Sequence, residues 1–190
     1  MKMKQRLAKS VLALFGWKVI IKFPPETKKF VVMMAPHTSN WDFVLGWLGY
    51  VSIGVYSRYL VKKEAFFFPL GEILTAMGGI PVDRKASTNI VQQVSEMFDK
   101  ADKLVITITP EGTRSLSPNW KRGFYHIAVH AQVPIAFGFL DYKKKTGGIG
   151  GILTPTGDYD ADLKIIEAFY ADISAKFPEK FNLRFKESEK

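Results

Sequence analysis

Short apolar runs alternate with segments of helical periodicity along almost the whole chain of 190 residues. Runs of strand length lie at 18–23, 30–35, 58–61, 80–82, 104–108, 133–140 and 149–153. Segments expected to be helical separate most of them, at 43–57, 69–77, 87–101 and 120–131, and a last one follows at 161–176. This alternation predicts a single layered α/β domain with a largely parallel or mixed sheet flanked by helices. The length suits one domain, and no repeat or long linker divides it.

The N-terminal residues 1–17 form a separate pattern, in which apolar and basic residues recur at helical spacing. The apolar positions are Met3, Leu7, Val11, Leu14 and Phe15. A basic amphipathic helix of this kind can lie in a membrane interface, with its cations on lipid phosphates. It can equally pack on the domain, which is the commoner fate of such a pattern. We therefore treat 1–17 as an amphipathic helix and a candidate membrane contact, and 18–190 as the main domain.

Charge and composition exclude several classes of function. The chain has a net charge of +9, no cysteine and three histidines. The lack of cysteine excludes disulfides, thiolate metal sites and a cysteine nucleophile. His126 and His130 have a spacing that can bind zinc, but no glutamate of a zinc-protease motif accompanies them, so we interpret them as one helix face. A basic protein attracts nucleic acid, anionic lipid or phosphorylated metabolites. Because no nucleic-acid-binding module is visible, we expect no nucleic-acid partner.

The segment 36–42, Pro-His-Thr-Ser-Asn-Trp-Asp, joins an expected buried strand to an expected buried helix. A carboxylate at Asp42 can accept a hydrogen bond from one nitrogen of His37, which fixes the tautomer and leaves the other nitrogen free as a base. Alternatively, a side chain at 38–40 caps the helix and Asp42 sits in its first turn. The motif alone favours capping slightly, and two later motifs reverse that preference.

Polar motifs follow three of the expected strands, at 37–42, 83–84 and 111–115. In an α/β sheet the loops at the carboxyl ends of the strands meet at one edge, where ligands bind. Arg84 and Arg114 suit a phosphate, because guanidinium is planar, bidentate and always charged. Gly112 lets the backbone approach a ligand closely. Taken singly, 83–84 could be a surface ion pair and 111–112 a simple turn.

Four motifs together resemble a known family. PHTSNWD, GGIPVDR, PEGTRS and VPIAF occur in the order and approximate spacing of the motifs of the glycerolipid acyltransferases, the relatives of lysophosphatidic acid acyltransferase. The resemblance runs from about His37 to Phe137 and makes 18–190 an acyltransferase domain. It implies transfer of an acyl group from acyl-CoA or acyl carrier protein, as co-substrate, to a lysolipid hydroxyl. The expected acceptor is 1-acylglycerol-3-phosphate, and no metal or redox cofactor is implied.

The resemblance also implies a role for each matching residue. His37 is the general base, and Asp42 orients it and stabilises the imidazolium. The acceptor hydroxyl takes the place of a serine nucleophile, so no acyl-enzyme is needed. The substrate-binding positions are Arg84, Glu111, Gly112, Thr113 and Arg114. Pro134, in the last motif, would help to shape the site.

The departures from the family pattern concern the acceptor rather than the chemistry. Pro36, Pro81-Val82 and Thr109 stand where relatives often have Asn, Phe-Ile and Phe. The alternatives left open are acylation of a lyso-amino-lipid or another lysophospholipid, thioester hydrolysis, and a non-catalytic lipid- or anion-binding module. Because the substrates implied are lipids, the expected location is cytoplasmic and peripheral, on the inner face of the membrane. We expect no signal peptide, and no apolar run reaches the roughly 18 residues of a transmembrane helix.

Overall fold

The computed structural model describes residues 2–24, 26–82 and 87–183, apart from the side chains of residues 87–89. Its helices are α1 (Met3–Leu14), α2 (Asn40–Ile53), α3 (Leu70–Ala76), α4 (Ser87–Lys100), α5 (Gly123–His130) and α6 (Tyr159–Tyr170). Its strands are β1 (Lys18–Ile21), β2 (Lys29–Met34), β3 (Ser57–Lys62), β4 (Gly79–Val82), β5 (Leu104–Ile108), β6 (Ile135–Asp141) and β7 (Thr146–Leu153). Short 3-10 turns lie at Lys63–Ala65 and Pro178–Lys180.

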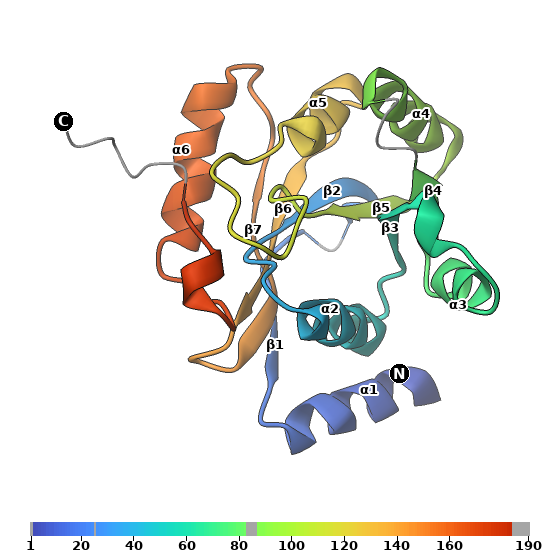
Figure 1. The fold of residues 1–190 in the computed structure, drawn as a ribbon, viewed down its shortest axis with the longest axis vertical. Helices are drawn as coiled ribbons and strands as arrows, with labels where there is room; N and C mark the ends of the chain where they lie inside the picture. The colour runs from blue at the N-terminus through green and yellow to red at the C-terminus, as the bar shows by residue number, and fades with distance from the viewer. Residues whose placement is uncertain (1, 25, 83–86, 184–190) are drawn as a thin grey trace.

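The strands form one mixed sheet in the order β1-β7-β6-β2-β5-β3-β4 (Figure 1). Strands β6, β2, β5, β3 and β4 are parallel, so their carboxyl ends share one edge. Strand β7 runs antiparallel to β6, and β1 pairs in parallel with β7. The expected fold, one α/β domain with a mixed sheet flanked by helices and an N-terminal helix, is confirmed.

Side chains alternate between two cores along the central strand β2. Val31 and Met33 belong to a core that α4, α5 and α6 complete, whereas Phe30 and Val32 belong to a core that includes α2. This repeat of two is the period of a strand buried on both faces. Accordingly, α2 lies on one side of the sheet with α1 beside it, and α4, α5 and α6 lie on the other (Figure 1).

Helix α1 presents apolar residues on two faces. Ala8 and Leu12 are buried where α1 packs against α2. Met3, Leu7 and Leu14 are 84%, 65% and 83% exposed. At 3.6 residues per turn these three share one face, roughly opposite the buried pair. The helix thus packs on the domain, as one of the two interpretations predicted, and it also leaves an apolar face exposed. No helix in the described part of the chain is both long enough and apolar enough to cross a membrane.

Several element boundaries differ from the expectation by a few residues, and two of these differences have a clear physical reason. The last helix, expected over 161–176, ends at Tyr170, and the chain then turns towards the β6–β7 loop, where the Ser174 carbonyl accepts a hydrogen bond from the Tyr142 N–H (2.9 Å). Strand β7 begins three residues earlier than expected, in a glycine-rich stretch. At Gly148 a Cβ would collide with the carbonyl oxygen of Ile20 on β1, so glycine permits the close pairing of these strands.

Candidate active site

Strand β2 delivers His37 to the sheet edge at which the parallel strands end. Because β2 lies between β5 and β6, the segments that follow all three strands meet there. The Tyr170 hydroxyl, on α6, donates to the carbonyl oxygens of Met33 and Gly138 at 2.7 and 2.8 Å, which ties the ends of β2 and β6 together. The His37 side chain is 19% exposed, so solvent or a substrate can reach the imidazole.

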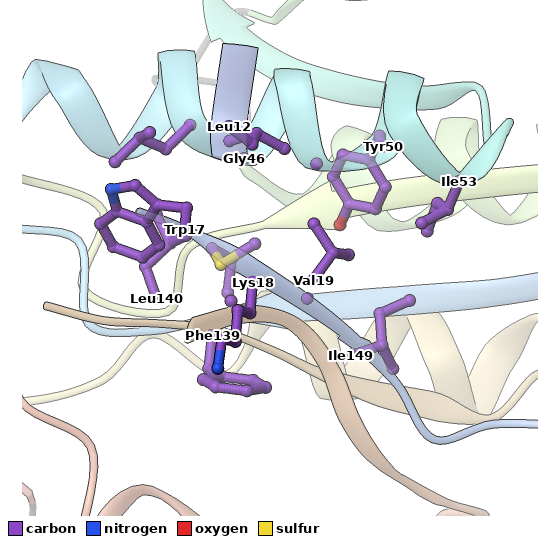
Figure 2. Close-up of a pocket in the computed structure, with 15 residues that line it drawn as sticks. Leu12, Trp17, Lys18, Val19, Gly46, Tyr50, Ile53, Phe139, Leu140 and Ile149 are labelled. Carbon is purple, nitrogen blue, oxygen red and sulfur yellow. The ribbon is translucent and has the colours of Figure 1, made fainter. Parts of the chain in front are cut away.

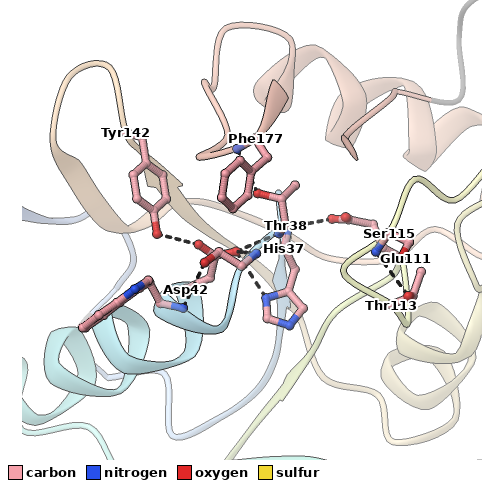
Figure 3. Close-up of polar contacts among 10 residues, drawn as sticks. His37, Thr38, Asp42, Glu111, Thr113, Ser115, Tyr142 and Phe177 are labelled. Carbon is pink, nitrogen blue, oxygen red and sulfur yellow. Dashed lines mark hydrogen bonds and ion pairs between the residues drawn. The ribbon is translucent and has the colours of Figure 1, made fainter. Parts of the chain in front are cut away.

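The same residues in the first turn of α2 cap the helix and contribute to the candidate site (Figure 3). Ser39 is the N-cap, and its hydroxyl accepts from the Trp41 N–H at 3.2 Å. Asp42 Oδ2 accepts from the N–H groups of Thr38 and Ser39 at 2.7 and 2.8 Å. The same oxygen lies 3.5 Å from Nδ1 of His37. The same segment therefore caps α2 and brings the Asp42 carboxylate to His37.

Asp42 is a buried carboxylate that remains ionised. Burial alone would raise its pKa, but the hydrogen bonds from His37, from Tyr142 and from the Ser39 N–H outweigh burial, and the pKa lies below its ordinary value of 3.8. A negative charge at Oδ2 favours the tautomer of His37 with its proton on Nδ1. That tautomer leaves Nε2 unprotonated, which is the state that a general base requires.

Tyr142 is a site residue that the sequence analysis missed. It follows β6, and its hydroxyl donates to Oδ1 of Asp42 at 2.6 Å (Figure 3). Burial, followed by the hydrogen bond to Asp42, raises the pKa of this phenol well above its ordinary value, so it stays a donor at neutral pH. The only available signal was its place at the carboxyl end of a strand in a parallel sheet.

Glu111 follows β5 and meets His37 from the other side. Its Oε1 accepts a hydrogen bond from the His37 N–H at 2.9 Å, so the 111–115 motif lies against the 37–42 motif, as expected (Figure 3). The side chain is buried, and Oε2 has no hydrogen-bond partner in the structure as described. Burial raises its pKa to about 7, the His37 N–H works against that rise, and the charge of Asp42 adds to it.

The remaining predicted positions lie on the loop after β5 or outside the described residues. Gly112 adopts a φ of 66°, a left-handed conformation that favours glycine. Thr113 and Arg114 are exposed, and the Thr113 hydroxyl accepts from the Ser115 N–H at 3.2 Å. Arg84 lies outside the described residues, two positions after β4 ends. Glu111 thus contacts His37, Gly112 follows it in the turn, and Thr113 and Arg114 lie on the exposed part of the same loop.

A small apolar cavity lies between α1, α2 and the strands β1, β6 and β7 (Figure 2). On α2 it is lined by Gly46, Tyr50 and Ile53, which follow Asp42 at one, two and three helical turns. Its volume is about 20 Å³, enough for a single water molecule. In this conformation the cavity therefore has no room for an acyl chain.

Comparison with known proteins agrees with this geometry. The family model described as Acyltransferase matches residues 18–136, more than half of the chain. No curated protein matches the sequence. Among solved structures, the chain is similar to the 1-acyl-sn-glycerophosphate (LPA) acyltransferase PlsC from Thermotoga maritima, with a TM-score of 0.58 and 17% identity over 87% of this chain and 74% of that one. At this identity the structural likeness supports the shared fold, whereas the family model covers the His37, Asp42 and Glu111 motifs. The resemblance to glycerolipid acyltransferases is confirmed, and the chain belongs to the Acyltransferase family of enzymes.

Proposed function

We propose that this enzyme transfers a fatty acyl group from an acyl-CoA or acyl carrier protein thioester to the free hydroxyl of 1-acylglycerol-3-phosphate, with His37 as the general base. The observation that carries the proposal is the imidazole of His37, which meets a buried, ionised carboxylate at Nδ1 and is partly open to solvent. A protein that only bound lipid would have no use for an oriented base.

The reaction follows from this arrangement. Nε2 of His37 removes the proton of the acceptor hydroxyl as the oxygen attacks the thioester carbonyl. Asp42 stabilises the imidazolium that forms, as the aspartate of a serine-protease triad does. The tetrahedral intermediate collapses with cleavage of the carbon–sulfur bond, and the imidazolium returns the proton to the departing thiolate. The products are the diacyl ester and the free thiol, and no acyl-enzyme forms.

The acceptor phosphate has candidate partners at the same sheet edge. Arg114 is exposed on the loop after β5, and we assign it, with Arg84, to the phosphate, because guanidinium binds phosphate oxygens in pairs. Thr113 and the backbone at Gly112 are assigned to the acceptor as well. The net charge of +9 favours an anionic acceptor at long range. Within the described residues, no cluster of three acidic, histidine or cysteine side chains could hold a metal ion.

We also propose that the enzyme works on the inner, cytoplasmic face of a membrane, held there peripherally by α1. Met3, Leu7 and Leu14 stay exposed in the described part of the chain, and the helix carries Lys and Arg side chains beside them. Such a helix would bury its apolar side chains at the acyl boundary and place its cations on lipid phosphates.

The test is thiol release by the purified protein with palmitoyl-CoA and a panel of acceptors. The panel contains 1-acylglycerol-3-phosphate, other lysophospholipids, a lyso-amino-lipid and no acceptor. His37→Ala should abolish release, whereas the matched control His130→Ala, an exposed histidine at the end of α5, should retain it.

Release that depends on 1-acylglycerol-3-phosphate and on His37 would support the proposal in full. Release stimulated by another acceptor would support His37 as the base and would identify a different acceptor. Release without an acceptor would mean thioester hydrolysis. An absence of release with both palmitoyl-CoA and an acyl carrier protein thioester would refute acyl transfer.

A further inference from the structure

Both oxygens of the Asp42 carboxylate are held, and each by different groups. Oδ2 accepts from two backbone N–H groups of the 36–42 segment and faces His37, whereas Oδ1 accepts from the Tyr142 hydroxyl at 2.6 Å. The terminal torsion of an aspartate is broad and roughly two-fold, so one held oxygen does not fix the plane of the carboxylate. The second contact does, and Tyr142 is the residue that supplies it.

Tyr142 is itself held firmly, although it lies outside the segment 18–136 that the family model matches. Its N–H donates to the Ser174 carbonyl, and its ring meets the ring of Trp17 edge to face, with centroids 5.1 Å apart and planes at 89°. Just before it, the buried carboxylate of Asp141 accepts from the N–H groups of Lys143 and Lys144 at 3.1 Å each, which shapes the β6–β7 turn.

The same turn is joined to the end of α1. The Trp17 N–H donates to the Leu12 carbonyl at 2.8 Å, and Lys145 Nζ donates to the Phe15 carbonyl at 3.2 Å. Lys18, which follows Trp17, pairs with Thr146 at the start of β7. The ring against which Tyr142 rests is therefore fixed by the candidate membrane-facing helix on one side and by the sheet on the other.

We propose that Tyr142 is a positioning residue for acyl transfer: it fixes the plane of the Asp42 carboxylate and so the orientation of His37, and Trp17 keeps its phenol in place. This inference rests on the proposed function. Within the described residues, the titratable groups that contact His37 are Asp42, at the imidazole, and Glu111, at the backbone N–H, with Tyr142 bonded to Asp42. Among these three, Tyr142 acts on the imidazole entirely through another side chain.

The variant is Tyr142→Phe, and the chain offers a matched control in Tyr125→Phe. The Tyr125 hydroxyl also donates to a buried carboxylate, Asp162 Oδ2, at 2.7 Å, but it lies between α5 and α6. Both variants lose one phenol–carboxylate hydrogen bond. Tyr142→Phe is expected to lower kcat about 10-fold, by analogy with the loss of groups that orient metal-bound histidines, with the KM for the acceptor within about 2-fold.

The pH dependence of kcat separates positioning from mere stabilisation. Without the phenol, the Asp42 charge is less neutralised and stabilises the imidazolium more strongly, so the acidic limb of the profile moves to higher pH in Tyr142→Phe. Tyr125→Phe should leave both kcat and the limb in place. Trp17→Leu, which keeps the phenol and removes its support, should show a smaller change of the same sign, and it replaces Tyr142→Phe if that variant does not fold.

A measurement without substrate keeps this inference separate from the proposed function. Nitrogen-15 spectra of the imidazole rings, with the His37 signals assigned from His37→Ala, report tautomer and hydrogen bonding directly. Tyr142→Phe should shift the ring nitrogens of His37 and leave those of His126 and His130 unchanged. Unchanged His37 signals, kcat and pH profile in Tyr142→Phe would overturn the inference while leaving the role of His37 intact. Shifted signals in a protein without transferase activity would uphold the positioning contact and overturn the proposed function.

Discussion

Glu111→Gln tests the electrostatics of the site through folding stability. In the folded protein the pKa of Glu111 is about 7, above its ordinary value of 4.5, chiefly because the side chain is buried. Below pH 4.5 the group is protonated in both the folded and the unfolded state. As the pH rises, the unfolded chain releases the proton first, so the free energy of unfolding falls until the pH passes about 7.

The size of this effect follows from the pKa. At 1.36 kcal/mol per pKa unit, Glu111 lowers the free energy of unfolding by about 3 kcal/mol once it is ionised. About 2.5 kcal/mol of that loss falls between pH 5 and pH 8. Glutamine keeps the oxygen that accepts from the His37 N–H but does not titrate. Between pH 5 and pH 8 the free energy of unfolding of Glu111→Gln, relative to that of the wild type, should therefore rise by about 2.5 kcal/mol. The cost of burying the amide is the same at both pH values and does not affect this rise.

The assay is urea unfolding followed by tryptophan fluorescence at pH 5, 6, 7 and 8, with linear extrapolation to water. Glu64→Gln, an exposed glutamate in the 3-10 turn Lys63–Ala65, is the matched control and should run parallel to the wild type. A stability difference between Glu111→Gln and wild type that stayed constant across the range would refute the reasoning, because it would mean that Glu111 titrates alike in both states.

Three further predictions concern catalysis, the acceptor and the membrane. Asp42→Asn should lower kcat by about 10⁴-fold, as the equivalent change does in a serine protease, because an amide favours the wrong tautomer; a loss below tenfold in thiol release would contradict the pairing. Arg114→Ala should raise the KM for 1-acylglycerol-3-phosphate about 10- to 100-fold and leave that for a phosphate-free monoacylglycerol unchanged; equal changes for both would exclude a phosphate contact. Leu7→Asp should weaken binding to phosphatidylglycerol vesicles about tenfold or more in sedimentation, because a buried leucine is worth about 1.5–3 kcal/mol. The same change at Ile165, which is exposed on α6, should have no effect.

The fold was largely predictable because its signals are local. Strand β2 is apolar throughout since it is buried on both faces, and β5 reads the same way. The two motifs that met in space, at His37 and Glu111, could be joined in advance because parallel strands end at one edge. Helix ends were less predictable, since Tyr170 ends α6 where the chain must reach the β6–β7 turn.

Individual side-chain contacts of the site were harder to predict than the meeting of its motifs. Asp42 lies only five residues from His37. Even so, the sequence does not reveal that its carboxylate accepts from the backbone N–H groups before α2 and contacts His37 at the same time. Tyr142 lies 100 residues from Asp42, and nothing in the local sequence distinguishes it from the other tyrosines. The two faces of α1 were hidden for a similar reason, because Ala8 and Leu7 cannot be assigned to opposite sides until the position of α2 is known.

The pairing of β1 with β7 has a consequence for how the chain is made. Val19 and Ile20 on β1 lie beside Gly147 and Gly148 on β7, so β1 must wait for a partner that is synthesised more than 120 residues later. Closing so long a loop is slow, and until it closes the apolar side chains of β1 stay accessible to other molecules. During translation, α1 and β1 leave the ribosome before β7 has been synthesised. Until β7 has been synthesised, β1 therefore lacks the strand with which it pairs in the sheet.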